Sequence, residues 1–271
     1  WPWSRVVGYR LTLGLMLASV LSLVHAQSPG MAQVMQNSES PTERPLSGFH
    51  FLTPETRAMQ QDDFANPGYL WVAAGAEAFQ QNVGAGSCAS CHDTKAMVGV
   101  ATRYPKFDES AQTLINLEGQ INQCRTNRQQ LPALALESQG LLALSSFITQ
   151  QSQGMPTSVS IHGPAAPWLD RGKDYFFQRR GQLNLACHQC HDESWGKMLR
   201  GDQVSQGQPN GFPAYRLEWQ SLGSLHRRLQ DCESGVRAQT QELGSDAYLA
   251  LELYLVWRSQ GLALESPAVR R

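Results

Sequence analysis

The sequence has no excess of charge of either sign and, beyond its first 26 residues, no long apolar run. Its 22 lysines and arginines are balanced by 23 acidic residues, which leaves a net charge of −1. Without a basic surplus, nothing in the charge favours a nucleic acid or an anionic membrane surface as a partner. A membrane-spanning helix needs about 20 consecutive apolar residues, so we expect no membrane span in the mature protein.

The one long apolar run lies near the N-terminus and has the layout of a secretion signal. Arg5 and Arg10 precede the apolar segment 11–24, and a small-residue cleavage pattern ends at Ala26. A transmembrane anchor is the alternative, but this segment is shorter than such a helix requires. We therefore predict a signal peptide over residues 1–26, which is removed on export, and a periplasmic location for the mature protein.

A strong alternation of apolar and polar residues, which would indicate strands, is also lacking, and the periodicity is mostly helical. Residues 27–57 are rich in Ser, Pro, Gln and Gly, which is typical of a linker or an extended arm. The rest of the chain contains an internal repeat, with shared residues at shared spacing. The matching pairs are Trp71 and Trp168, Gly75 and Gly172, Phe79 and Phe176, Pro105 and Pro213, Leu114 and Leu222, Leu117 and Leu225, Ile121 and Leu229, and Cys124 and Cys232. We predict two domains, residues 58–158 and 159–271.

Six cysteines in an exported chain usually suggest three disulfides, but four of them belong to another pattern. The two Cys-x-x-Cys-His motifs comprise Cys88, Cys91 and His92 in the first copy, and Cys187, Cys190 and His191 in the second. In this motif both thiols bond covalently to a haem, and the histidine ligates its iron. A zinc half-site or a dithiol redox pair is the alternative, but a redox pair needs no histidine and zinc needs two further ligands. We predict two covalently bound c-type haems in two tandem, mostly α-helical, cytochrome c-like domains.

Methionine, the usual second axial ligand of an electron-carrier cytochrome c, is lacking where it would be needed. In the second copy only Met198 follows His191, and it is too close in the sequence to reach around the haem. In the first copy Met97 is similarly close to its motif, and Met155 lies at the end of the domain. The remaining candidates are His226 and Cys232 in the second copy, and Cys124 in the first.

Cys124 and Cys232 occupy equivalent positions, whereas His226 has no counterpart because residue 118 is a glutamate. Each cysteine extends an apolar stripe at helical spacing, so we expect both thiols to face the interior of their domains. The stripes are Leu114, Leu117 and Ile121, and Leu222, Leu225 and Leu229. The alternatives are small core residues or a disulfide between the two cysteines, which would require inward-facing positions of separate domains to meet. We favour axial thiolates on both irons, which would stabilise ferric iron and lower its reduction potential.

The two copies differ four residues before the cysteine. The second copy has Arg228 at this position and the first has Gln120. Residues i and i+4 are neighbours on a helix, so the guanidinium would lie beside Cys232, depress its thiol pKa and hold a small anion. Arg227 and Arg237 add positive charge nearby, although a single arginine is usually a solvated surface residue. We predict that the second copy is reactive and that the first is structural or stores electrons.

Taken together, these residues resemble the dihaem A subunit of the SoxAX cytochromes, the L-cysteine S-thiosulfotransferases of bacterial sulfur oxidation. The resemblance rests on the two haem motifs, the cysteine after each, and the segment Arg-Leu-Gln-Asp-Cys at 228–232. The stretch at 54–72 is also similar to the family's entry into its first domain. The similarity spans roughly residues 50 to 265.

The resemblance implies a set of roles. Cys232, as a persulfide or a thiolate, would be the catalytic residue, and Arg228 would bind the substrate. The iron ligands would be His92 with Cys124 and His191 with Cys232. The reaction would join thiosulfate oxidatively to a cysteine of the SoxYZ carrier protein, with electrons passing through haem to an acceptor cytochrome c. A small monohaem cytochrome, SoxX, would complete a heterodimer.

Two alternative functions are weighed against this one. The first is a dihaem electron-transfer protein without its own substrate, and the second is a haem-based sensor of small ligands.

Overall fold

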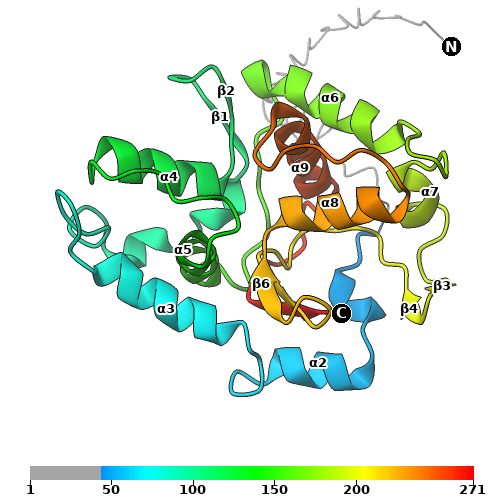
Figure 1. Cartoon of the computed structure of the whole chain (residues 1–271), viewed down its shortest axis with the longest axis horizontal. Helices are drawn as coiled ribbons and strands as arrows, with labels where there is room; N and C mark the ends of the chain where they lie inside the picture. The colour runs from blue at the N-terminus through cyan, green and yellow to red at the C-terminus, as the bar shows by residue number, and fades with distance from the viewer. Residues whose placement is uncertain (1–43) are drawn as a thin grey trace, which may run out of the picture. The chain divides into compact units, whose positions relative to one another are not determined.

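The computed structural model describes residues 44–271 (Figure 1). The predicted signal peptide and the first part of the predicted linker lie outside this range. The described part of the linker is folded: it contains the 3-10 helix η1 (Gly48–Phe51) and leads into helix α2 (Pro54–Gln61). Thr53 caps α2 by accepting a hydrogen bond from the backbone amide of Thr56, and a proline occupies the first helical position.

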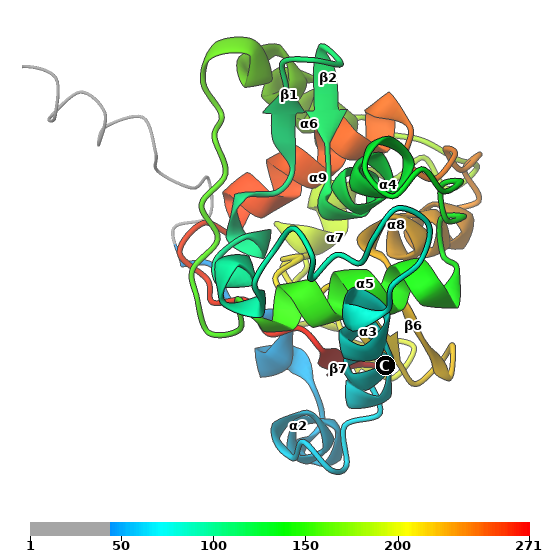
Figure 2. The same ribbon diagram turned by 90° about the vertical axis from the view of Figure 1, so that its left-hand side faces the viewer.

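Two sets of elements follow, one for each copy of the repeat (Figures 1 and 2). The first copy comprises α3 (Tyr69–Gln80), the 3-10 helices η2 (Thr94–Met97) and η3 (Ala101–Arg103), strands β1 (Lys106–Asp108) and β2 (Thr113–Ile115), and helices α4 (Leu117–Asn127) and α5 (Gln139–Gln150). The second comprises the 3-10 helix η4 (Gly163–Ala165), α6 (Ala166–Phe177), α7 (Cys187–His191), β3 (Met198–Leu199), β4 (Asp202–Gln203), β5 (Ala214–Arg216), β6 (Ser221–Gly223), α8 (Leu225–Gly235), α9 (Asp246–Arg258) and β7 (Ala268–Arg270). Among the described residues, no helix has the length and apolar character needed to cross a membrane.

Each copy is built on one pair of packed helices, α3 with α5 and α6 with α9 (Figure 2). The helices of a pair meet at a glycine: a Cβ on Gly75 would lie 2.0 Å from the carbonyl oxygen of Ala143. A Cβ on Gly172 would lie 2.0 Å from the carbonyl oxygen of Ala250. Only glycine, which has no Cβ, permits so close an approach. This contact explains why glycine recurs at these two places of the repeat.

Replacing Gly172 with alanine should force α6 away from α9 and lower the free energy of unfolding by about 1–3 kcal/mol, the usual cost of overpacking a core. Gly140→Ala is the matched control, because a Cβ there would meet the side chain of Leu134 at 3.8 Å, an ordinary contact. The control adds the same methyl group to α5 and should leave the free energy of unfolding unchanged or slightly higher. Chemical denaturation measures both variants, and equal effects would contradict the prediction.

A β-hairpin precedes the cysteine-bearing helix of each copy. Strands β1 and β2 pair antiparallel, as do β5 and β6. A capping residue then starts the helix: Asn116 accepts a hydrogen bond from the amide of Gly119 in α4, and Ser224 accepts one from the amide of Arg227 in α8. In the second copy β7 adds to β5 in parallel, which gives the sheet order β6-β5-β7. The sequence pattern did not reveal these strands because each spans at most three residues.

The hairpins also hold the two copies together. Leu114 on β2 is buried in one cluster with Trp168 and Leu253 of the second copy. In the same way, Leu222 on β6 is buried in a cluster with Leu142 on α5 of the first copy. Our expectation that Leu114 and Leu222 extend a helical stripe into their own domains is therefore wrong, because both lie on strands and pack against the other copy. This reciprocal packing fixes the position at which each cysteine-bearing helix begins.

Candidate functional site

All six cysteines lie in the described part of the chain and are free thiols. The disulfide between Cys124 and Cys232, considered above as an alternative, is therefore not formed. Cys124 lies on α4 and Cys232 on the equivalent helix, α8. The second haem motif forms the short helix α7, whereas the first lies in the loop after α3.

Cys232 faces the haem motif of its own copy. Its side chain interacts with that of His191, and it lies close enough to Cys187 and Cys190 to raise the pKa of both thiols further than burial alone. The Nδ1 atom of His191 is 2.8 Å from the carbonyl oxygen of Ser205. Because a carbonyl oxygen only accepts hydrogen bonds, Nδ1 carries the proton, which leaves Nε2 as the nitrogen directed toward Cys232. This is the tautomer in which histidine ligates a metal.

The loop that orients His191 belongs to the second copy alone. A Cβ on Gly207 would lie 2.9 Å from Cγ of His191, so the loop leaves room for the imidazole only because residue 207 is glycine. The loop falls within residues 201–211, where the second copy is longer than the first. Two thiols, an imidazole protonated on Nδ1, and the further sulfur of Cys232 facing them are donors suited to a covalently bound c-type haem. The residues present therefore fit this cofactor.

The charges around Cys232 favour its thiolate. Burial alone would raise the pKa of this thiol, but the cation of Arg228, together with His191 and Arg216, lowers it to about 7. The guanidinium of Arg228 is 4.0 Å from the carboxylate of Asp231, and its side chain is 35% exposed. Cys232 is therefore an ionisable sulfur with a partly exposed cation one helical turn away.

The equivalent site of the first copy has a neutral amide in place of the guanidinium. The Nε2 amide of Gln120 is 3.6 Å from Sγ of Cys124, where the second copy has a guanidinium. Burial and the neighbouring Cys124 raise the pKa of Cys88. His92 is exposed, and among the described residues no hydrogen bond or ion pair joins its side chain to Cys124. The structure therefore brings Cys124 close to its motif but does not show the paired arrangement of the second copy.

The other residues considered as axial ligands lie elsewhere. Nε2 of His226 is 2.9 Å from Oε2 of Glu252, and its Nδ1 accepts a hydrogen bond from the amide of Gly244. Burial alone would lower the pKa of His226, but the bond to Glu252 gives a raised value. Met97 is buried in the core of the first copy, and Met198 is exposed on β3. His226 is thus a buried partner of a carboxylate, which removes it as a candidate ligand.

Comparisons with known proteins agree on one family. The family model described as the SoxA/TsdA cytochrome c domain matches residues 74–157, in the first copy. The L-cysteine S-thiosulfotransferase subunit SoxA of Pseudaminobacter salicylatoxidans is 42% identical over 236 residues, which cover 85% of this chain and 82% of that protein. The corresponding subunit of Paracoccus pantotrophus is 39% identical and covers 83% and 78%. The chain belongs to the SoxA family.

A solved structure supports the same assignment for the fold. The crystal structure of SoxXA from P. pantotrophus matches with a TM-score of 0.82 and 37% identity, over 88% of this chain and 90% of that one. The prediction of a mostly α-helical fold with two tandem cytochrome c-like domains is confirmed. Membership of the SoxA family also confirms covalent c-type haem as the cofactor and identifies the chain as a subunit of an L-cysteine S-thiosulfotransferase in sulfur oxidation.

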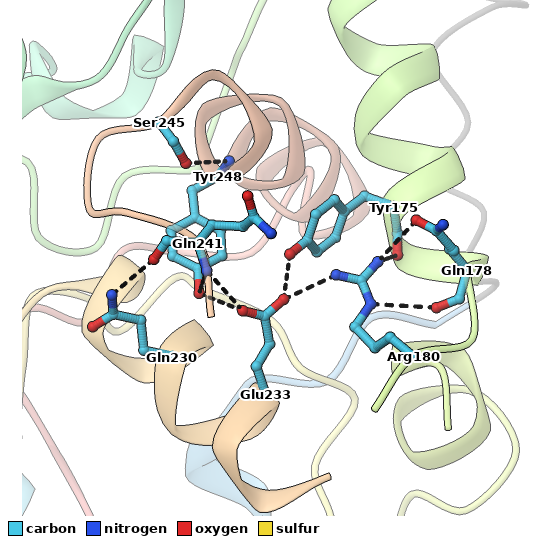
Figure 3. Close-up of polar contacts among 8 residues, drawn as sticks. All are labelled: Tyr175, Gln178, Arg180, Gln230, Glu233, Gln241, Ser245 and Tyr248. Carbon is cyan, nitrogen blue, oxygen red and sulfur yellow. Dashed lines mark hydrogen bonds and ion pairs between the residues drawn. The ribbon is translucent and has the colours of Figure 1, made fainter. Parts of the chain in front are cut away.

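In this SoxA-family chain, α8 is anchored by Glu233, the residue that follows Cys232 (Figure 3). Its carboxylate accepts hydrogen bonds from the hydroxyls of Tyr175 and Tyr248, and it pairs with Arg180 at 2.9 Å. Burial and the hydrogen bond to this carboxylate raise the pKa of both tyrosines, so their hydroxyls remain protonated donors. The arginine side chain also stacks on the ring of Tyr175, 3.5 Å from its centroid. This cluster ties α8 to α6 and α9.

The sequence analysis missed this cluster, although the repeat carries a signal for it. At the position of Glu233 the first copy has Arg125, and at the position of Tyr175 it has Ala78. A comparison of the two copies at every position, and not only at the shared ones, would have marked these residues as specific to the second copy. The members of the cluster, however, come from α6, the loop after it, α8 and α9, and cannot be paired from spacing alone.

Proposed function

We propose that this SoxA-family chain carries two covalent haems and that its second copy, residues 159–271, is the catalytic domain. Cys88 and Cys91 hold the first haem in residues 58–158, and Cys187 and Cys190 hold the second. The proposed iron ligands are His92 with Cys124 in the first copy and His191 with Cys232 in the second. Cys232, as a thiolate or a persulfide, is the proposed catalytic residue.

One observation carries the assignment of the reactive domain: the sulfur of Cys232 faces His191 and has the cation of Arg228 beside it. The first copy keeps the cysteine but has the neutral Gln120 in place of the arginine. An anionic substrate is therefore attracted to one of the two sulfurs. A thiosulfate dianion would be bound by the guanidinium through an oxygen, by charge-assisted hydrogen bonds.

The proposed reaction joins two sulfur atoms and releases two electrons. The cysteine thiolate of a carrier protein, SoxYZ, forms a bond to the terminal sulfur of thiosulfate and becomes a cysteine S-thiosulfonate. No atom is lost apart from the proton of the carrier thiol, and the two electrons leave to an acceptor cytochrome c. The haems, when bound, would supply the one-electron steps, and Cys124 and Cys232 as thiolate ligands would keep their potentials low. Arg228 orients the anion, and the sulfur of Cys232 faces the sulfur being transferred.

The partners follow from the same family. The matched crystal structure is of SoxXA, and we propose that this chain pairs with a small monohaem cytochrome, SoxX. We also propose that the protein acts in the periplasm, after removal of residues 1–26, which lie outside the described residues.

Replacing Arg228 with glutamine tests the proposed substrate-binding role, because it gives the second copy the residue that the first copy has. A charge-assisted hydrogen bond contributes about 1.5–3 kcal/mol, so kcat/KM for thiosulfate should fall by about 10- to 100-fold. The intact mass of the exported protein should still show two haems. Steady-state assays of thiosulfate conjugation to the carrier thiol measure the effect.

Arg237→Gln is the control, because it removes the same charge from an exposed side chain. It should keep kcat/KM within about twofold, as expected for a surface substitution. Undiminished turnover in the Arg228 variant would refute its role. Failure of the wild-type protein to conjugate thiosulfate would favour the electron-transfer alternative.

A further inference from the structure

A second arginine, Arg216, lies on the central strand of the sheet next to α8. It is the last residue of β5, where it pairs in register with Ser221 on β6 and Arg270 on β7. Its side chain is 9% exposed. The strand β6 leads directly into the cap of α8, so the sheet and the cysteine-bearing helix form one continuous unit.

The guanidinium of Arg216 has a hydrogen-bond partner at one terminal nitrogen but none at Nε. One terminal nitrogen donates to Oε2 of Glu218 at 3.1 Å, and the group lies 4.9 Å from the ring centroid of Trp219. The indole nitrogen of Trp219 in turn donates to Asp231 at 2.8 Å, which fixes the ring. The buried Nε of Arg216, however, has no hydrogen-bond partner among the described residues. A buried donor without a partner is costly, and a bound anion would satisfy it.

The charges of two arginines act on the sulfur of Cys232. Burial lowers the pKa of Arg216, and the neighbouring cation of Arg228 lowers it further. The charge of Arg216 also acts on Cys232. Like charges held close together repel each other, and a bound anion offsets this repulsion. The arrangement therefore suits a ligand with a double negative charge better than a single guanidinium would.

The first copy provides an internal comparison on the same backbone. Strand β1 matches β5, and the residue equivalent to Arg216 is Asp108. Hydrogen bonds from Ser110 and Gln123 lower the pKa of Asp108 to about 2, so this position carries a negative charge. With Gln120 in place of Arg228, the first copy has one anion and no cation where the second has two cations. Both positions are thus more positive in the second copy than in the first.

We propose that Arg216 is a second substrate-binding residue of the catalytic domain, and that it and Arg228 bind different oxygens of one tetrahedral sulfur oxyanion. The inference rests on the proposed function and deepens it. A two-arginine site would select dianions such as thiosulfate over monoanionic or neutral sulfur donors, and would hold the sulfonate end so that the terminal sulfur faces Cys232. Sulfate, a dianion of the same shape with an oxygen in place of the terminal sulfur, should compete at this site.

Calorimetric titration of the haem-loaded, oxidised protein with thiosulfate tests the inference directly. The Kd of the Arg216→Gln variant should rise by about 10- to 100-fold, as for a lost charge-assisted hydrogen bond. KM for thiosulfate should rise in parallel, and inhibition by sulfate should weaken. Arg216→Lys, which keeps the charge but loses the planar fork, should show a smaller rise. Asp108→Asn, at the equivalent position of the first copy, should leave the Kd unchanged.

Glu218→Gln tests the same role without changing a buried residue, because the side chain of Glu218 is 68% exposed and the variant should fold normally. The substitution removes the carboxylate that competes with thiosulfate for the guanidinium of Arg216. The Kd for thiosulfate should then fall by roughly two- to fivefold, the usual size of a surface ion-pair effect. An unchanged Kd in Arg216→Lys and Glu218→Gln, with a weakened Kd in Arg228→Gln, would overturn the role of Arg216 and leave a one-arginine site. Absence of thiosulfate conjugation by the wild-type protein would instead reject the proposed function.

Discussion

Replacing Cys232 with methionine should raise the reduction potential of the second haem by an amount on the order of hundreds of millivolts. In the proposed ligation the cysteine sulfur is anionic and favours ferric iron, whereas a neutral thioether favours ferrous iron. Potentiometric titration followed by visible absorption measures the shift. The rate of thiosulfate conjugation should fall in the same variant, because a neutral thioether cannot ionise to the thiolate that is proposed as the catalytic group.

Cys124→Met is the matched variant in the first copy. It should shift the potential of the other haem only, and it should leave the affinity for thiosulfate unchanged, since the first copy has Gln120 rather than an arginine beside its sulfur. Both variants should retain two covalent haems, because the attaching thiols belong to the motifs. A second-haem potential that stays the same in Cys232→Met would show that this sulfur does not ligate iron.

The internal repeat made much of the fold predictable. Gly75 and Gly172 recur because two helices touch at each of them, and Cys124 and Cys232 recur because they lie at equivalent places on α4 and α8. These features depend on local spacing along a helix, which the sequence displays directly. The same comparison singled out Arg228 by its difference from Gln120, and the structure places its charge beside Cys232.

Contacts between residues far apart in the sequence could not be predicted from the spacing of the repeat. Leu114 and Leu222 have the spacing of a helical stripe, but each lies on a three-residue strand and packs against the other copy. His226 was a candidate ligand until the structure paired it with Glu252, which is 26 positions away in the sequence. The sequence analysis did not identify Arg216, because the hairpin that places it next to α8 has strands of only three residues, too short to give a recognisable alternation.

Replacing Glu233 with alanine should lower the free energy of unfolding by about 3–5 kcal/mol, because it breaks a buried ion pair by removing one partner. The carboxylate pairs with Arg180, whose side chain is only 15% exposed, and it accepts hydrogen bonds from the hydroxyls of Tyr175 and Tyr248. Without it, a largely buried cation and two hydroxyls lose their acceptor. Denaturant unfolding followed by circular dichroism measures the loss. Glu242→Ala, on an exposed residue, should change the free energy by less than about 0.5 kcal/mol.

The same substitution separates a merely stabilising cluster from one that positions the site. Glu233 adjoins Cys232 on α8, so loss of its contacts should disturb the absorption and paramagnetic-resonance spectra of the second haem while those of the first remain unchanged. The double variant Arg180→Met with Glu233→Ala removes both charges and should recover part of the lost stability. If stability returned but the spectrum of the second haem did not, the cluster would hold the sulfur of Cys232 in place through its hydrogen bonds to the two tyrosines. If the spectrum never changed, the cluster would serve stability alone.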